Sequence, residues 1–180
     1  MKTMTNEQAV EWIKSVGLRA NFTRKVDLAS ETKFGFTVQL PPLMPYQIPY
    51  FASTLLPGSY EQPEPFLLWI IDNGAPGELA FDIGCRMLSL LRESHGDHRM
   101  ILESPGYLFD CVDRKEPVDA RLLVTMTVLF SWDAYLVPQH GKYFIRIDDD
   151  EFVDVLFNEK QHCDMMMEKF KEWNPVRQQC

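Results

Sequence analysis

Residues 132–151 read WDAYLVPQHGKYFIRIDDDE, and this stretch decides how the C-terminal half of the chain is expected to fold. The segment Pro138–Gly141 contains turn-forming residues, and apolar and aromatic side chains flank it on both sides. Two such runs joined by a short Pro- and Gly-containing segment are typical of a β-hairpin. We therefore predict a hairpin whose second strand is Lys142–Ile147.

The segments on either side of this hairpin extend the prediction. Arg121–Trp132 is rich in β-branched and apolar residues, which predicts a long strand. Ala134–Val137 either continues that strand or forms a separate one after a bulge. Beyond the acidic run, apolar residues at helical spacing predict a final helix that begins near Asp150. This stripe consists of Cys163, Met166, Phe170 and Trp173.

The N-terminal half alternates helical and strand patterns. Thr5 with Gln8 three residues later forms a capping-box pattern at the start of a first helix. Phe66–Ile71 is a continuous apolar run, which predicts a strand buried on both faces. The other predicted elements are a strand at 34–40, a short helix at 49–56, a helix at 78–93 and a short helix at 106–112.

Taken together, these patterns predict a single α+β domain over residues 1–180. Its sheet is expected to be mixed or mainly antiparallel, to include the C-terminal hairpin and to pack against about three main helices. The Pro-rich segment 41–65 is expected to cover this domain, because its tyrosines and phenylalanine suggest that it packs down.

The composition limits the classes of partner. The 180 residues carry a formal charge of −8, and 46% of them are hydrophobic, which is enough for a sizeable core. Nucleic acids and anionic membranes are disfavoured as partners, because both require clustered Lys and Arg. Four widely spaced cysteines and an N-terminus without a signal-peptide pattern predict a soluble, cytoplasmic protein.

The acidic run Asp148–Glu151 is the most conspicuous polar feature and has three possible explanations. Carboxylates near the N-terminus of the final helix would cap it and interact favourably with its dipole. The same residues could form an acidic surface for a partner, or could ligate a divalent cation. Capping is the explanation that base rates favour.

A partner-binding surface is the functional hypothesis that the acidic zone favours. Acidic residues steer a basic partner, and aromatic side chains anchor it. In size and charge, although in no motif, the chain resembles bacterial toxin-neutralising immunity proteins. The first hypothesis is therefore a non-enzymatic, immunity-like or inhibitor protein that binds a basic protein. The expected binding residues are Trp132, Asp133, Tyr135, Asp148, Asp149, Asp150 and Glu151.

Two alternatives stay open at this point. A metal-dependent hydrolase could use Asp133 and Asp148–Glu151 together with a histidine. A ligand pocket could form among the aromatic residues of the Pro-rich segment. No catalytic, cofactor or structural-metal motif stands out in the sequence, and the oligomeric state is left open.

Overall fold

The computed structural model describes residues 1–21, 23, 25–29, 33–39, 46–58, 63–72, 79–97, 105–111, 116–148 and 152–178. Within these residues it contains ten β-strands, five α-helices and one 3-10 helix. Their bounds are β1 (Lys2–Met4), α1 (Asn6–Ser15), β2 (Arg19–Ala20), β3 (Val26–Asp27), β4 (Phe34–Gln39), α2 (Gln47–Leu55), β5 (Phe66–Asp72), α3 (Leu79–Ser94), β6 (Gly106–Phe109), α4 (Glu116–Leu129), β7 (Asp133–Pro138), β8 (Tyr143–Asp148), β9 (Phe152–Phe157), α5 (Lys160–Lys169), η2 (Lys171–Trp173) and β10 (Val176–Arg177).

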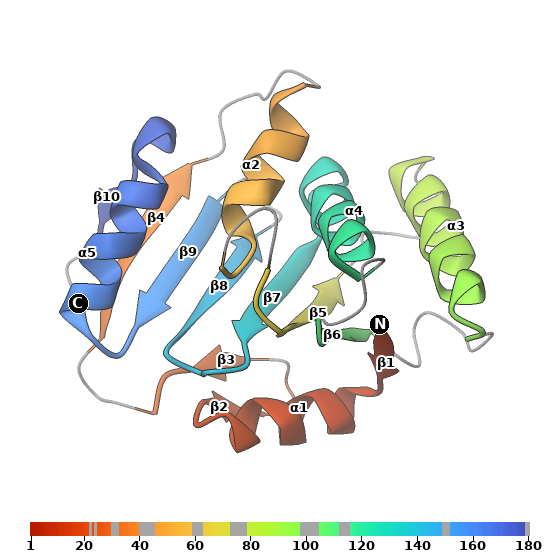
Figure 1. The fold of residues 1–180 in the computed structure, drawn as a ribbon, viewed down its shortest axis with the longest axis horizontal. Coiled ribbons are helices and arrows are strands. Elements are labelled where there is room, and N and C mark those ends of the chain that lie inside the picture. The colour runs from red at the N-terminus through yellow and green to blue at the C-terminus, as the bar shows by residue number, and fades with distance from the viewer. Residues whose placement is uncertain are drawn as a thin grey trace.

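Eight strands form one sheet in the order β1-β6-β5-β7-β8-β9-β4-β10, and β2 pairs with β3 in a second, two-stranded sheet. All strand pairs in the described residues are antiparallel. The first and last strands of the chain lie at opposite edges of the large sheet (Figure 1). In the described residues, none of the helices has the length and apolar character needed to cross a membrane.

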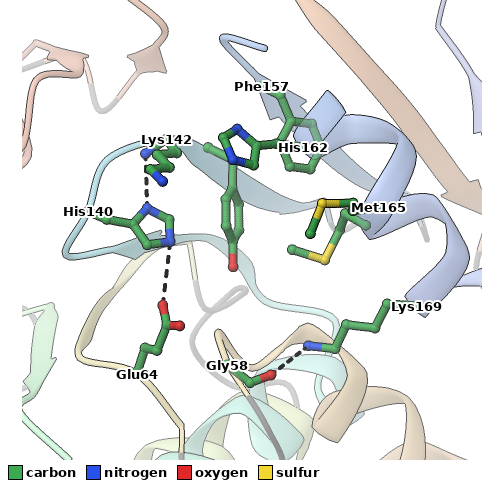
Figure 2. A pocket seen from close by; sticks show the side chains of 10 residues that line it. Gly58, Glu64, His140, Lys142, Phe157, His162, Met165 and Lys169 are labelled. Carbon is green, nitrogen blue, oxygen red and sulfur yellow. Dashed lines mark hydrogen bonds and ion pairs between the residues drawn. The ribbon is translucent and has the colours of Figure 1, made fainter. Parts of the chain in front are cut away.

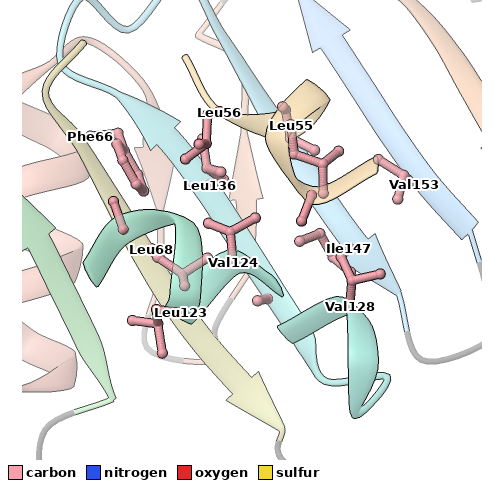
Figure 3. Close-up of a cluster of buried hydrophobic side chains, with 14 of the residues drawn as sticks. Leu55, Leu56, Phe66, Leu68, Leu123, Val124, Val128, Leu136, Ile147 and Val153 are labelled. Atoms are coloured by element: carbon pink, nitrogen blue, oxygen red, sulfur yellow. The ribbon is translucent and has the colours of Figure 1, made fainter. Parts of the chain in front are cut away.

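The larger hydrophobic core lies between one face of the sheet and helices α2, α3, α4 and α5. α4 contributes Leu123, Val124 and Val128, which pack with Leu136 of β7 and Ile147 of β8 (Figure 3). Each of these five side chains is buried. Burying one such side chain contributes about 1.5–3 kcal/mol, so this layer supplies much of the driving force for folding.

The smaller core lies on the other face, under α1 and the β2–β3 pair. Ala9, Val10 and Ile13 form the buried side of α1. They belong to the same cluster as Leu67 and Trp69 of β5. Since Phe66 and Leu68 of β5 belong to the larger core, side-chain alternation buries this strand on both faces.

Several predictions from the sequence are confirmed. The Thr5 hydroxyl accepts a hydrogen bond from the backbone N–H of Gln8, and the Gln8 side chain accepts one from the backbone N–H of Thr5. This capping box begins α1 as predicted. The two-sided burial of β5 is also confirmed, as are the strand at β8, the short helix at α2 and the long helix at α3.

The predicted fold class is wrong in its arrangement. Five α-helices, rather than about three, pack against an eight-stranded antiparallel sheet, and a second sheet of two strands accompanies it. The separation of helices from antiparallel strands stays roughly consistent with α+β. Residues 41–45 and 59–62 of the predicted Pro-rich cover lie outside the described residues.

The largest error concerns 121–132, which was predicted to be a strand. Most of it belongs to α4, whose side chains are apolar on almost every side of the helix. Leu123 and Val124 are buried, while Leu122 and Leu129 are exposed. A helix without a polar face loses the 3.6-residue period, so its β-branched residues dominate the pattern.

Two other predicted helices are strands. Gly106–Phe109 is β6, which pairs with both β1 and β5, although Ser104-Pro105 resembles the start of a helix. Residues 152–157, predicted to be helical, form β9 between β8 and β4. The final helix begins at Lys160, so the acidic run does not cap it.

Gly84 provides a test of how α3 packs. A β-carbon at this position would collide with the ring of Trp132, which is fully buried. We expect Gly84→Ala to lower the free energy of unfolding by about 1–3 kcal/mol through overpacking, although alanine favours a helix. Urea unfolding measures the change, and Leu90→Ala on the exposed side of α3 is the control. A Gly84→Ala variant as stable as the parent would contradict the packing.

Candidate functional site

The structure separates the residues predicted to bind a partner. Trp132 is buried in the larger core, and its ring packs against Phe130 at a centroid distance of 5.5 Å. Tyr135 is buried in the smaller core, with its ring 5.7 Å from that of Phe144. Neither aromatic side chain is exposed enough to anchor a partner in this conformation.

Asp133 and Asp148, in contrast, meet around one arginine. Arg146 of β8 forms an ion pair with Asp148, and its Nε lies 3.8 Å from an Asp133 carboxylate oxygen. The arginine side chain is 39% exposed, and the two carboxylates are partly exposed. A pair of this kind is worth at most about 1 kcal/mol, so its main effect is to orient the charges.

These residues lie on the sheet face that α1 covers only in part. Phe144 packs in the smaller core, so Arg146 and Asp148 point to the same side. In the register of β8 with β9, Arg146 lies opposite Asp154, and Asp148 lies opposite Phe152. The smaller core includes only one side chain of β9, the partly buried Leu156, so its cover thins toward β4 and β10.

A second polar group continues across this part of the sheet. Asp154 accepts hydrogen bonds from Thr37 Oγ1 at 2.6 Å and from Gln178 Nε2 at 2.7 Å. Two large apolar side chains, Phe152 and Val176, are 39% and 68% exposed. We call this region the open sheet face. It consists of Asp133, Arg146, Asp148, Phe152, Asp154 and Val176.

The remaining predicted site residues, Asp149, Asp150 and Glu151, lie outside the described residues. Within the described part of the chain, no group of three or more His, Cys, Asp or Glu side chains could hold a metal ion. The described histidines pair elsewhere: His95 lies 2.8 Å from Asp119, and His140 lies 3.5 Å from Glu64.

A pocket that was not predicted lies on the opposite side of the sheet, beside α5 (Figure 2). It encloses about 360 Å³, a volume suited to a small molecule. Its walls come from the segment before β5, from the β7–β8 turn, from β8 and β9, and from α5. They include Glu64, His140, Tyr143, Phe157, His162 and Lys169.

The polar groups of the pocket are held by specific contacts. The backbone N–H of Lys142 donates to His140 Nδ1 at 3.1 Å, so neutral His140 carries its proton on Nε2, which faces Glu64. Burial lowers the pKa of His140, and the Glu64 carboxylate partly offsets this effect. His162 lies in the first turn of α5, and its Nδ1 is 3.3 Å from a carboxylate oxygen of Glu159, the residue that precedes this helix.

Lys169 is the most perturbed cation of the pocket. Its ammonium donates to the backbone oxygens of Leu56 at 2.7 Å and Gly58 at 3.4 Å, two bonds that tie the end of α5 to the segment after α2. Partial burial lowers the pKa of Lys169 to about 8, although the residue as a whole is exposed, and the Glu64 carboxylate opposes this effect. Burial also raises the pKa of the Tyr143 hydroxyl.

Sequence reasoning missed this pocket because its residues span more than a hundred positions. The pairing of Tyr143 with Phe157 between β8 and β9 brings two walls together, and that pairing was hidden by the wrong assignment of 152–157 as helix. The turn residue His140 and the helix residue His162 carry no shared motif.

Comparison of the chain with protein-family models, with curated proteins and with solved structures finds no match.

The pKa of Lys169 predicts a pH dependence of stability. Between about pH 8 and 10.5, the unfolded chain keeps the Lys169 proton while the folded protein loses it, so stability should rise with pH. Urea unfolding should show a gain over this window in the parent relative to Lys169→Met. Lys171→Met is the control. Glu168 raises the pKa of Lys171, so loss of the Lys171 proton gives the folded protein no gain in stability over this window. A parent and a Lys169→Met variant with parallel pH profiles would contradict the assignment.

Proposed function

We propose that this chain is a non-enzymatic protein-binding domain whose open sheet face holds a basic segment of another protein. The observation that carries the proposal is the arrangement of Asp133, Asp148 and Asp154 beside exposed Phe152 and Val176. Three carboxylates accompany a single guanidinium, so the surface is net negative.

The chemistry of this face suits a cationic partner. Carboxylates at the rim of an interface attract a basic partner and set the salt dependence of association. A partly exposed phenylalanine gives such an interface an apolar anchor, where binding energy concentrates. Arg146 holds Asp133 and Asp148 close together, which reduces the entropy lost when a partner orders them.

The chain's charge of −8 extends the same preference over the whole molecule. An acidic binding protein of this size suits an immunity-like or inhibitor role, in which it covers a basic surface of its target. The cytoplasm is the compartment that we propose, because the four cysteines are widely and irregularly spaced in the sequence.

Affinity capture from the source lysate, followed by binding measurements with the purified partner, tests this proposal. We expect the double variant Asp133→Asn/Asp148→Asn to slow association, and Phe152→Ser to weaken affinity about tenfold or more. Raising the salt concentration from about 0.05 M to about 0.5 M should weaken the parent more than the double variant.

Glu11→Gln, at an exposed position of α1, is the matched control for loss of an acidic charge. Thermal unfolding of every variant checks that the fold is intact, because removing the two carboxylates leaves Arg146 without these partners. If the purified partner binds the Phe152→Ser and double variants as tightly as the parent, the open sheet face is not its binding site.

A further inference from the structure

The pocket beside α5 combines an apolar interior with several nitrogen-bearing side chains. His140 and Lys142 approach from the β7–β8 turn, and His162 and Lys169 approach from α5 (Figure 2). Among the lining residues that the structure describes, Glu64 is the one acidic side chain, and it faces His140. Among these described lining residues, the groups that can carry positive charge therefore outnumber the negative ones.

We propose that this pocket binds a small organic anion, a molecule with one carboxylate or phosphate group and a short apolar body, whose anionic group bonds to Lys169. This site is independent of the open sheet face. Tyr143 and Phe157 belong to the larger core, so the pocket lies on the helix-covered side of the sheet.

The geometry of Lys169 supports an anionic ligand. An ammonium group has three N–H donors, and the carbonyl oxygens of Leu56 and Gly58 accept two of them. Carbonyl oxygens orient the ammonium but carry no formal charge, and among the described residues the Glu64 carboxylate offsets its positive charge only in part. A ligand carboxylate or phosphate oxygen that accepts from the third donor would form a charge-assisted hydrogen bond, which is stronger than one between neutral groups.

The walls of the pocket favour an apolar body on the ligand. The rings of Tyr143 and Phe157, whose centroids lie 5.2 Å apart, pack against each other in the wall of the pocket. Met165 and Met166 line the pocket one turn before Lys169 on α5. Methionine side chains adapt readily to the shape of an apolar ligand. An anionic head at Lys169 with a short chain along these residues would use both features.

The charge preference can be tested with four six-carbon probes of similar size: hexanoate, hexyl phosphate, 1-hexanol and hexylamine. Binding is followed at pH 7, below the pKa of Lys169, through the ¹³C methyl signals of Met165 and Met166. We expect saturable shifts with hexanoate or hexyl phosphate, and binding about tenfold or more weaker with hexanol and hexylamine. The stronger of the two anions identifies the head group.

Variants then locate the anionic group. Lys169→Met should weaken binding of the preferred anion about tenfold or more, and Lys169→Arg should retain most of the affinity. Lys160→Met, an exposed position on the same helix, should leave it unchanged. The inference is overturned if hexanol or hexylamine binds as well as both anions, if no probe gives saturable shifts, or if a folded Lys169→Met variant binds like the parent. The probe comparison needs only the parent protein, so it decides the matter even if Lys169→Met does not fold.

Discussion

The burial of the central strands on both faces is the constraint on which this structure depends. In β5, Phe66 and Leu68 pack under the helices, while Leu67 and Trp69 pack under α1. A strand with apolar side chains on both sides requires a cover on each face. The chain supplies the first cover with α2, α3, α4 and α5, and the second with α1 and the β2–β3 pair.

The asymmetry of these two covers creates both candidate sites. The second cover is short, so it reaches β5, β7 and β8 and leaves most of β9, β4 and β10 to polar side chains such as Asp154 and Thr37. On the opposite face, α5 packs over β4 and β9, and the pocket lies beside it, where Lys169 joins α5 to Leu56 and Gly58. The open sheet face therefore results from the limited extent of the second cover, and the pocket results from the position of α5 on the first.

An element could be predicted from the sequence when its burial produced a clear local pattern, such as an amphipathic helix or a continuous apolar strand. The capping box of α1 and the apolar run of β5 are local signals, and both led to correct predictions. The prediction for α4 was wrong because this helix exposes the apolar residues Leu122 and Leu129 as well as burying Leu123 and Val124. The prediction for β9 was wrong for another reason, because the acidic run Asp148–Glu151 that precedes it resembles the cap of a helix. Its own alternation of buried Val153, Val155 and Phe157 was a strand signal that could have identified it.

The candidate sites were predictable only in part. The meeting of Asp133 with Arg146 and Asp148 follows from the β7–β8 hairpin, which was predicted. The inward direction of Trp132 and Tyr135 was missed, and so were Phe152, Asp154 and Val176. The pocket depends on a register between β8 and β9 and on the position of α5, and no local pattern encodes either of these.

One face of the sheet is covered at β5 and β7 and open at β9. Hydroxyl-radical footprinting with mass spectrometry tests this arrangement directly on three aromatic residues of that face. The structure predicts strong protection of Trp69 and Tyr135 together with ready oxidation of Phe152. Protection of Phe152 equal to that of Trp69, or ready oxidation of Tyr135, would contradict this arrangement.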